Sequence, residues 1–402
     1  MAGQNITNIE RIVHFAVGGN VWDNLIVDWS RSGSATELEL AASDYNGNNV
    51  TVTNLASDDF VIVSGTDIGT LSLSNVNPIG LTDYINLELE TVLGNSALPL
   101  IDNLVIPTTT EILNLVVSGP GGAVIDDASN IDTDVILTGT GNLRVGSSGE
   151  TFDFDTGVID ASDYEGDLFV VTGNGNQAIV GGLGDDVIAL TTNGGYVSIT
   201  LGTNADVVEL LSGGNDVVQF QAFYEFASGT ATNANYHLVN GFETADDVLA
   251  FNAAFAGGGG GAAFFTLGGV DIAVGADVQV MSYQAGTVIN GTLPGLSDSN
   301  FIKFTTAAVG VNLTVNDIVD QAFGVGSIAV NNAISGAAGV LASAYDVTSG
   351  VMVLFTIEDN DNNPGNLLTA ADDVDVLGLV TMTQAEYNAF GMSNIDFVGA
   401  LV

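Results

Sequence analysis

The feature that most constrains this chain is a nine-residue pattern of glycines, aspartate and apolar residues that recurs between residues 172 and 220. Its fullest form is Gly181-Gly182-Leu183-Gly184-Asp185-Asp186-Val187-Ile188. The aligned repeats centre on positions 177, 186, 195, 206 and 216, so the later repeats carry small insertions. A period this short, with turn residues followed by β-branched residues, predicts stacked turns joined by short strands.

Each residue type in the pattern has a physical role. Glycine permits a tight turn and lets backbone carbonyls approach an ion. The aspartate supplies a carboxylate, and the apolar residue two positions later points inward from a short strand. Two repeats make one turn of a parallel coil, so that every second loop stacks on the same side. Calcium prefers carboxylate and carbonyl oxygens, and the pattern therefore predicts calcium between stacked loops.

Some repeats have lost the aspartate, and the positions of these losses predict where calcium binds. Asp186 and Asp206 lie two repeats apart and fall on one side of the coil, whereas the other repeat centres fall on the opposite side. We expect one calcium site between the loops of Asp186 and Asp206, and a degenerate row opposite. The predicted ligand set is Gly182, Gly184, Asp186, Gly202, Asn204 and Asp206, with Gly214 and Asp216 in the degenerate row. A metal-free coil turned by glycine and asparagine remains the alternative.

A second acidic stretch begins at Asp359, where aspartate and asparagine alternate. Asp372 follows Asp361 at the spacing of the last ligand in an EF-hand loop. The candidate calcium ligands here are Asp359, Asp361, Asn363 and Asp372. However, Asp372 is not glutamate and Asn366 stands where that loop needs glycine. An ordinary turn rich in aspartate and asparagine therefore stays open as the alternative.

Composition favours divalent cations as partners. The chain has 48 acidic residues against four basic ones, for a net charge of −44. Nothing is available to neutralise phosphates, which excludes nucleic acid as a partner. A compact chain with this charge repels itself, so either bound calcium or a halophile-style acidic surface has to compensate. Cysteine is absent, which excludes disulfides and thiolate sites, and the two histidines, His14 and His237, argue against zinc.

The expected fold class is all-β, in three parts. Residues 1–165 contain short strands and read as a β-solenoid or a sandwich, with the motif Ala-Ser-Asp-Tyr-x-Gly at both 42–47 and 161–166. Residues 166–225 should form a short parallel β-roll, and residues 226–402 a β-rich C-terminal domain with one short helix over 383–390. No apolar stretch is long enough to predict a transmembrane segment, and the N-terminus does not read as a signal peptide.

At the repeat residues the chain resembles the RTX (repeat-in-toxin, haemolysin-type calcium-binding) family of type I secreted proteins. Gly181 to Ala189 matches the family nonapeptide in full, and the resemblance is confined to the segment 172–220. It implies Ca2+ as cofactor and a secreted, extracellular or cell-surface location. Gly241 to Phe251 looks like the segment that closes an RTX roll, and the tail from Asp396 resembles a type I secretion signal. The Ala161-Ser162-Asp163 segment resembles parts of RTX-bearing surface-layer proteins and adhesins.

The function expected is structural rather than enzymatic. The chain carries neither His-Glu-x-x-His nor Gly-x-Ser-x-Gly, and strand edges of a solenoid favour self-association. We therefore expect a calcium-dependent bacterial surface-layer or fibre subunit that forms a homo-oligomer, lattice or filament. The alternative is an RTX adhesin or a module that binds a cell-surface glycan, and an RTX-tailed hydrolase is the third possibility.

Overall fold

The computed structural model describes most of the chain and divides it into two compact units, Met1–Val197 and Ser198–Val402. The described residues are 11–14, 24–41, 48–64, 67–76, 83–91, 98–128, 131, 133–146, 157–173, 176–190, 195–220, 236–252, 266–267, 272–273, 275–290, 295–310, 313–330, 339–358 and 367–398.

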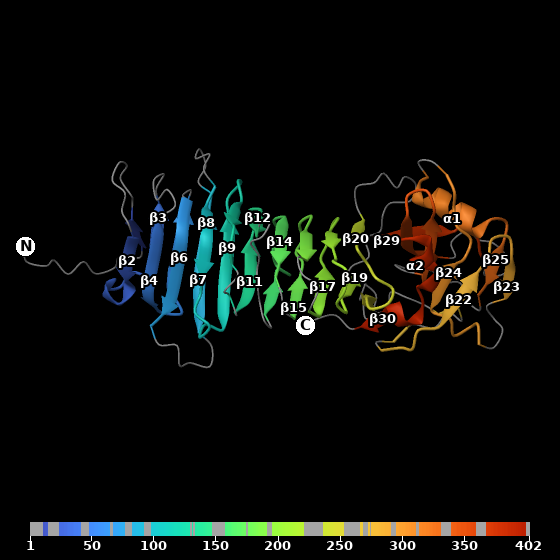
Figure 1. Ribbon diagram of the computed structural model, residues 1–402, viewed down its shortest axis with the longest axis horizontal. Helices are drawn as coiled ribbons and strands as arrows, with labels where there is room; N and C mark the ends of the chain where they lie inside the picture. Colours follow the sequence, from blue (N-terminus) through green and yellow to red (C-terminus); the bar gives the residue numbers. More distant parts are fainter. Residues whose placement is uncertain are drawn as a thin grey trace, which may run out of the picture. The chain divides into compact units, whose positions relative to one another are not determined.

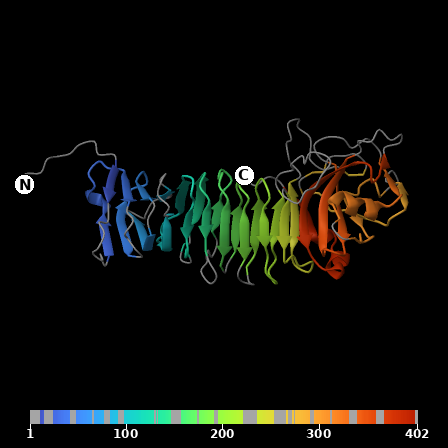
Figure 2. The same ribbon diagram turned by 90° about the horizontal axis from the view of Figure 1, so that it is seen from above.

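The first unit is a parallel β-solenoid in which each coil adds one strand to each of two sheets (Figure 1, blue to green). One sheet has the order β1 (Arg11–His14), β3 (Glu37–Ala41), β5 (Phe60–Ser64), β7 (Tyr84–Glu90), β9 (Ile112–Ser118), β11 (Asp134–Gly139), β13 (Val158–Asp160) and β15 (Gln177–Val180). The other has the order β2 (Asn24–Asp28), β4 (Asn49–Leu55), β6 (Asp67–Asn75), β8 (Leu100–Val105), β10 (Ala123–Ile125), β12 (Leu143–Val145), β14 (Leu168–Thr172) and β16 (Val187–Leu190). Figure 2 shows the same stack from above.

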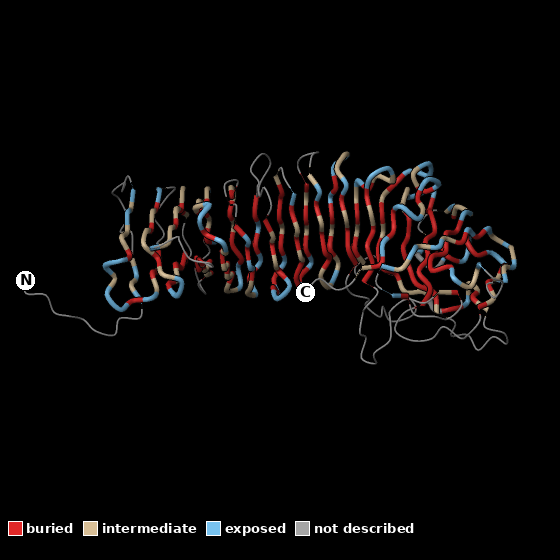
Figure 3. Tube along the Cα trace, turned by 90° about the horizontal axis from the view of Figure 1, so that it is seen from below, coloured by how far each residue is buried: buried red, intermediate tan, exposed pale blue. Residues whose placement is uncertain are grey.

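Aliphatic side chains fill the space between these two sheets. Alternate residues of each strand are buried, as the red segments of Figure 3 show, and the paired registers place them above one another in successive coils. Leu87 of β7, for example, pairs with Leu115 of β9, and both side chains are 1% exposed or less. Such in-register stacks exclude water along the whole solenoid and stabilise each coil mainly through its two neighbours.

The coils shorten toward the nonapeptide region. Asn86 and Asn114 occupy equivalent positions 28 residues apart, and the Nδ2 group of Asn114 donates to Oδ1 of Asn86 at 2.7 Å. At the end of the first unit Phe169 pairs with Val187, and the equivalent positions of Leu168 and Asp186 are only 18 residues apart. The predicted coil of two nine-residue repeats is therefore present between β14 and β16, and residues 1–165 form a solenoid rather than a sandwich.

The second unit begins with the same parallel pairing and continues into antiparallel strands. The parallel orders are β17 (Val197–Leu201), β19 (Val217–Phe220), β21 (Val248–Asn252), β30 (Ile395–Val398), and β18 (Val207–Glu209), β20 (His237–Asn240), β29 (Asp373–Thr381). From β29 the sheet continues through β27 (Val351–Glu358), β26 (Val340–Asp346), β24 (Phe301–Phe304) and β22 (Val280–Tyr283). A small separate sheet has the order β23 (Val288–Asn290), β25 (Ser327–Ala329), β28 (Leu367–Leu368).

Aromatic rings fill the core of the second unit. Phe304 lies at its centre, with ring centroids 4.7 Å from Phe323 and 5.1 Å from Tyr283. Lys303 is the only Lys or Arg of this unit and is buried, 7% exposed. Its Nζ donates to the carbonyl oxygens of Asn388 (3.0 Å) and Phe390 (2.6 Å), and burial lowers the pKa of this amine. Lys303 therefore links β24 (Phe301–Phe304) to the C-terminal end of the helix Gln384–Ala389 through two hydrogen bonds.

The two α-helices of the described residues both belong to the second unit. α2 (Gln384–Ala389) follows the capping residue Thr383, whose side chain accepts from the Glu386 amide, and it confirms the helix predicted over 383–390. α1 (Val315–Phe323) was not predicted, although Thr314 and Asp317 form the same capping arrangement. Short 3-10 turns occupy η1 (Trp29–Arg31) and η2 (Met392–Asn394). No helix in the described ranges is long and apolar enough to cross a bilayer.

Two other sequence features can be compared with the fold. The segment Gly241–Phe251, which resembles the end of an RTX roll, leads into β21, and β21 pairs in parallel with both β19 and β30. The solenoid pairing therefore does not stop at this segment. The five-glycine run at 257–261 and the tail beyond residue 398 lie outside the described residues.

Candidate functional site

The predicted ligand Asp186 lies at a corner of the first unit, immediately before β16. Its side chain is 1% exposed, and both of its oxygens accept backbone amides. Oδ2 accepts from Gly182 in the same turn at 2.8 Å, and Oδ1 accepts from Leu168 of the preceding coil at 2.9 Å. The carboxylate therefore closes its own turn and holds it against the coil before it.

The two predicted glycines of this corner are required by the close stacking of the coils. A Cβ atom on Gly182 would overlap the carbonyl oxygen of Tyr164, and one on Gly184 would overlap that of Gly166. The carbonyl of Tyr164 accepts from the Leu183 amide at 2.7 Å. Both glycines thus lie directly above the Ala-Ser-Asp-Tyr-x-Gly motif at 161–166, which forms the corresponding corner one coil earlier.

The corner at Asp206 belongs to the second unit and has a different partner. Asp206 is 1% exposed, and its Oδ2 lies 3.2 Å from Nδ1 of His237, which is itself 4% exposed. The Asp206 amide also donates to the same nitrogen at 3.3 Å. Nδ1 accepts this amide when the ring carries its proton on Nε2, and it donates to the carboxylate when Nδ1 itself carries a proton. Asn204, which replaces an expected glycine, adopts φ 72°, a left-handed conformation that asparagine tolerates better than most residues.

The repeat around Asp216 is joined to a carboxylate that the repeat pattern does not include. The Asp216 amide donates to Oδ1 of Asp247 at 3.1 Å, and the Glu243 amide donates to Oδ2 of Asp247 at 2.8 Å. Asp247 is 3% exposed. Burial raises the pKa of Asp247, the two amides oppose that rise, and the charges of Glu243 and Asp246 add to it. Gly214, the predicted glycine of this loop, has φ 115°.

Asp186 and Asp247 therefore form the same structure in the two units, which we call the aspartate clamp. In each case one oxygen accepts the amide four residues earlier, and the other accepts an amide of the preceding coil. Each clamp satisfies two amides that would otherwise be buried without partners. Sequence analysis identified Asp186 as a ligand but missed Asp247, although each aspartate immediately precedes an apolar strand.

The remaining predicted ligands divide into two groups. Asp359, Asp361 and Asn363 lie outside the described residues. Asp372 is 7% exposed, and its Oδ2 accepts from the amide and the hydroxyl of Thr369. Gly202 is partly exposed and lies two residues before Asn204. The predicted site that joins the loops of Asp186 and Asp206 stays a prediction.

The oxygen atoms at these corners meet only part of the ligand requirement of calcium. Each described corner offers one buried carboxylate, and carboxylate oxygens are ligands that calcium prefers. In the described ranges, however, no group of three or more Asp, Glu or His side chains gathers as a ligand set. Calcium at a corner would therefore depend on backbone carbonyls for most of its ligands.

Two other polar features of the first unit were missed by sequence analysis. The exposed residues Asn142, Asp167 and Asp185 form a ladder across three coils, in which Asp167 donates its amide to Asn142 at 3.1 Å and accepts that of Asp185 at 3.1 Å. Gln177, which occupies an aspartate position of the repeat, is 3% exposed, and neither polar atom of its side chain has a partner in the described structure. An amide oxygen is also a calcium ligand, so this position keeps a ligand atom although the aspartate of the repeat is lost.

Comparison with known proteins identifies no relative. No protein-family model, no curated protein and no solved structure matches the chain. The resemblance to RTX proteins therefore rests on the nonapeptide residues alone.

Proposed function

We propose that this chain is an extracellular structural protein of the RTX type, which assembles with copies of itself and is stabilised by calcium. Its activity would be mechanical and architectural, as in a surface-layer or fibre subunit. Type I secretion would export it, with the signal in its C-terminal tail.

The observation that carries the proposal is the coil stacking of the first unit. Every coil buries its apolar face against the next, and the outermost strands β1 and β2 pair on one side only within the described residues. Val13 of β1 is 39% exposed and Ile26 of β2 is 72% exposed. Unpaired parallel edges with exposed apolar residues accept further strands, and a second copy of a solenoid supplies strands of matching spacing.

Charge supports the calcium part of the proposal. A chain with a net charge of −44 cannot approach its own copies closely unless cations neutralise part of that charge. The described corners place buried carboxylates beside tightly stacked backbone, and exposed carboxylates such as Asp185 and Asp167 lie next to them. Calcium at these corners would remove repulsion and add cross-links between coils.

Electron microscopy of the purified full-length chain tests the assembly. We expect filaments or a regular lattice in millimolar calcium, and dispersed particles in excess EDTA. Magnesium at the same concentration is the control for ionic strength, because it requires a smaller and more regular oxygen cage. Monodisperse monomers in calcium at every concentration tried would contradict self-assembly.

Calorimetric titration of calcium tests the proposed ligands. The variant with both Asp186→Ala and Asp206→Ala should lose the tightest binding phase. The matched control is Asp58→Ala, which removes an exposed carboxylate of the first unit outside residues 172–220 and should retain that phase. Full calcium affinity in the double variant would refute the site.

A further inference from the structure

Arg144 differs from the other two arginines of the first unit. Arg11 lies within 2.9 Å of a Glu39 oxygen and close to two other glutamates, and Arg31 pairs with Asp28 at 3.3 Å. Arg144 is exposed and forms neither an ion pair nor a hydrogen bond with the described residues. In a chain this acidic, a guanidinium that has no carboxylate partner among the described residues is conspicuous.

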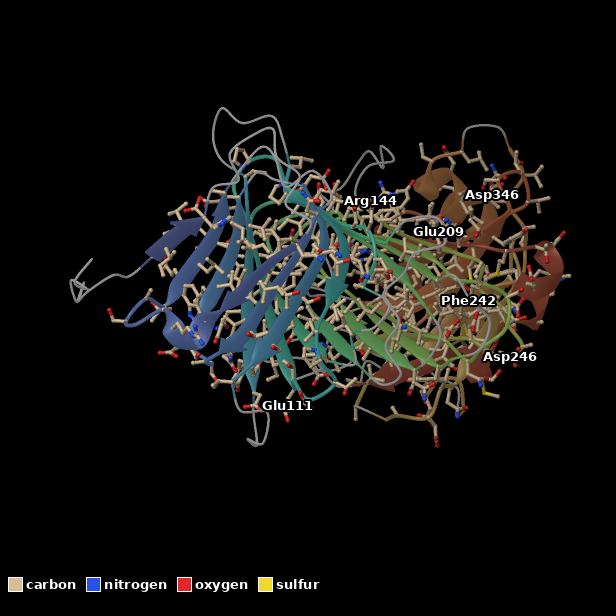
Figure 4. All side chains as sticks on the ribbon, turned by 60° about the vertical axis from the view of Figure 1, so that its left-hand side comes forward. Glu111, Arg144, Glu209, Phe242, Asp246 and Asp346 are labelled. Carbon is tan, nitrogen blue, oxygen red and sulfur yellow. The ribbon has the colours of Figure 1, made fainter. Side chains whose placement is uncertain are left out.

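The Arg144 side chain is nevertheless held in place. Its guanidinium carbon lies over the Phe169 ring, 5.4 Å from the ring centroid. Arg144 projects from β12 (Figure 4), and the strand registers align it with Val124 on one side and with Phe169 and then Val187 on the other. These four side chains form a row across the outer face of β10, β12, β14 and β16, about 14 Å long at the usual spacing between strands.

This row forms the floor of a groove of about 290 Å³. Leu98, which is 42% exposed, lines the groove together with the row, and so do the polar residues Asn142, Asp167 and Asp185. The polar residues are fixed by the corner ladder, because the Asn142 side-chain amide donates to Oδ2 of Asp167 at 2.9 Å. The groove thus combines an aromatic and aliphatic floor, one guanidinium and a rigid border of carboxylates and an amide.

We propose that this groove binds a neutral oligosaccharide. The C–H faces of sugar rings pack on aromatic and aliphatic surfaces, while hydroxyl groups both donate and accept hydrogen bonds. The groove offers matching partners, with N–H donors on Arg144 and carboxylate acceptors on Asp167. The apolar surface is supplied by Leu98, Val124 and Val187, beside the Phe169 ring that carries the guanidinium. The flat shape suits a short chain of sugar rings, since the groove extends across four strands.

Charge selects a neutral sugar over an acidic one. Arg144 faces two carboxylates in the groove, Asp167 and Asp185, so the local charge is negative even with the guanidinium included. The net charge of −44 repels a polyanion over longer distances as well. Binding of this ligand does not depend on the proposed assembly, because every lining residue belongs to the first unit of one copy.

Titration calorimetry of the full-length chain tests the groove. The probes are hexasaccharides of glucose, galactose, mannose and N-acetylglucosamine, with oligogalacturonate as the acidic comparison. We expect at least one neutral hexasaccharide to bind and oligogalacturonate to bind more weakly. Arg144→Gln and Phe169→Ala should each weaken that binding about tenfold or more, because one removes charge-assisted hydrogen bonds and the other removes the ring that holds the guanidinium in place.

Two controls distinguish loss of the site from loss of the fold. Ile136→Ala removes a similarly exposed apolar side chain (38%) from β11 of the opposite sheet, and it should leave sugar binding unchanged. Circular dichroism should show that all three variants retain the strand content of the natural chain. Absence of binding to all four neutral probes, unchanged affinity in both groove variants, or preference for oligogalacturonate would overturn the proposal.

Discussion

The two units of this chain bury their interiors with different side chains and hold their strands by different means. In the first unit the described buried aromatic residues are Trp29 and Tyr164, and the core consists of aliphatic stacks that repeat from coil to coil. In the second unit twelve described Phe and Tyr residues are buried, and many of their rings contact one another. The first unit is a series of similar layers, whereas the second has a central cluster.

This difference has consequences for how a local change spreads. A solenoid coil contacts only its neighbours, so its stability is close to a sum of local terms. A cluster around Phe304 joins helix α1 to β22, β24 and β27 through shared rings, and loss of one ring affects all of them. The second unit should therefore unfold more cooperatively than the first.

The largest expected effect is that of Phe304→Ala. Removing a fully buried ring from the cluster should lower the free energy of unfolding of the second unit by about 3–5 kcal/mol. Hydrogen exchange followed by mass spectrometry should show faster exchange throughout β22, β24, β26 and β27. The comparison variant is Leu115→Ala in β9, whose effect should remain within β7, β9 and β11.

An exposed substitution in the second unit provides the control for this comparison. Val288 is 76% exposed, and Val288→Ala should leave exchange in the aromatic cluster unchanged. If Phe304→Ala accelerated exchange only next to β24, or if Leu115→Ala did so across the whole first unit, the contrast between layered and clustered cores would be wrong.

A smaller effect is expected for Asp186→Asn. The amide side chain can accept only through one oxygen, so one of the two clamped backbone amides loses its partner, at a cost of about 1–3 kcal/mol. Thermal or denaturant unfolding of the first unit measures this loss. Asp185→Asn is the matched control, because Asp185 is exposed and lies outside the clamp. Equal destabilisation by both substitutions would show that the clamp has no special role.

The sequence predicts those parts of the fold that depend on contacts between residues close together in the chain. The nonapeptide spacing predicts the coil of two repeats, because that coil follows from positions a few residues apart. It predicts Asp186 as a calcium ligand, which stays a prediction, and it did not predict the two backbone amides that Asp186 accepts. The β26–β27 hairpin is local, with Asp346 paired to Val351, and sequence analysis did not identify it. The parallel pairing of β29 with β20 was not predicted, since it joins segments that are distant in sequence. The same limit applies to the candidate site, where His237 reaches Asp206 from 31 residues away.

The groove shows a second reason why sequence alone is insufficient. Val124, Arg144, Phe169 and Val187 belong to four different strands and follow no motif, and only the strand register brings them into one row. Coil length varies between neighbouring coils, so that register could not be derived from a fixed period.

The smallest expected effect concerns pH and Asp247. Because burial raises the pKa of Asp247, the folded chain binds this proton more readily than the unfolded chain does. Ionisation of Asp247 therefore costs stability as the pH rises from about 4 through the raised pKa. The stability advantage of the natural chain over Asp247→Asn should be largest near pH 4 and shrink toward neutral pH.

The control for this pH dependence is Asp298→Asn, at an exposed position of the second unit whose charge is not among the causes of the Asp247 shift. Its stability relative to the natural chain should change little between pH 4 and 7. A stability difference for Asp247→Asn that grows with pH would mean that the clamp favours the charged carboxylate, and the sign of the shift would be wrong.

The most direct test of calcium stabilisation is hydrogen exchange of the full-length chain in millimolar calcium and in excess EDTA. Free calcium at about 100 times the dissociation constant of a site stabilises the folded chain by about 2.7 kcal/mol. We therefore expect exchange at β16, β18 and β19 to slow markedly in calcium, while β3 to β9 of the first unit change little. Identical exchange in calcium and EDTA throughout residues 172–220 would contradict the proposal that calcium stabilises the repeat.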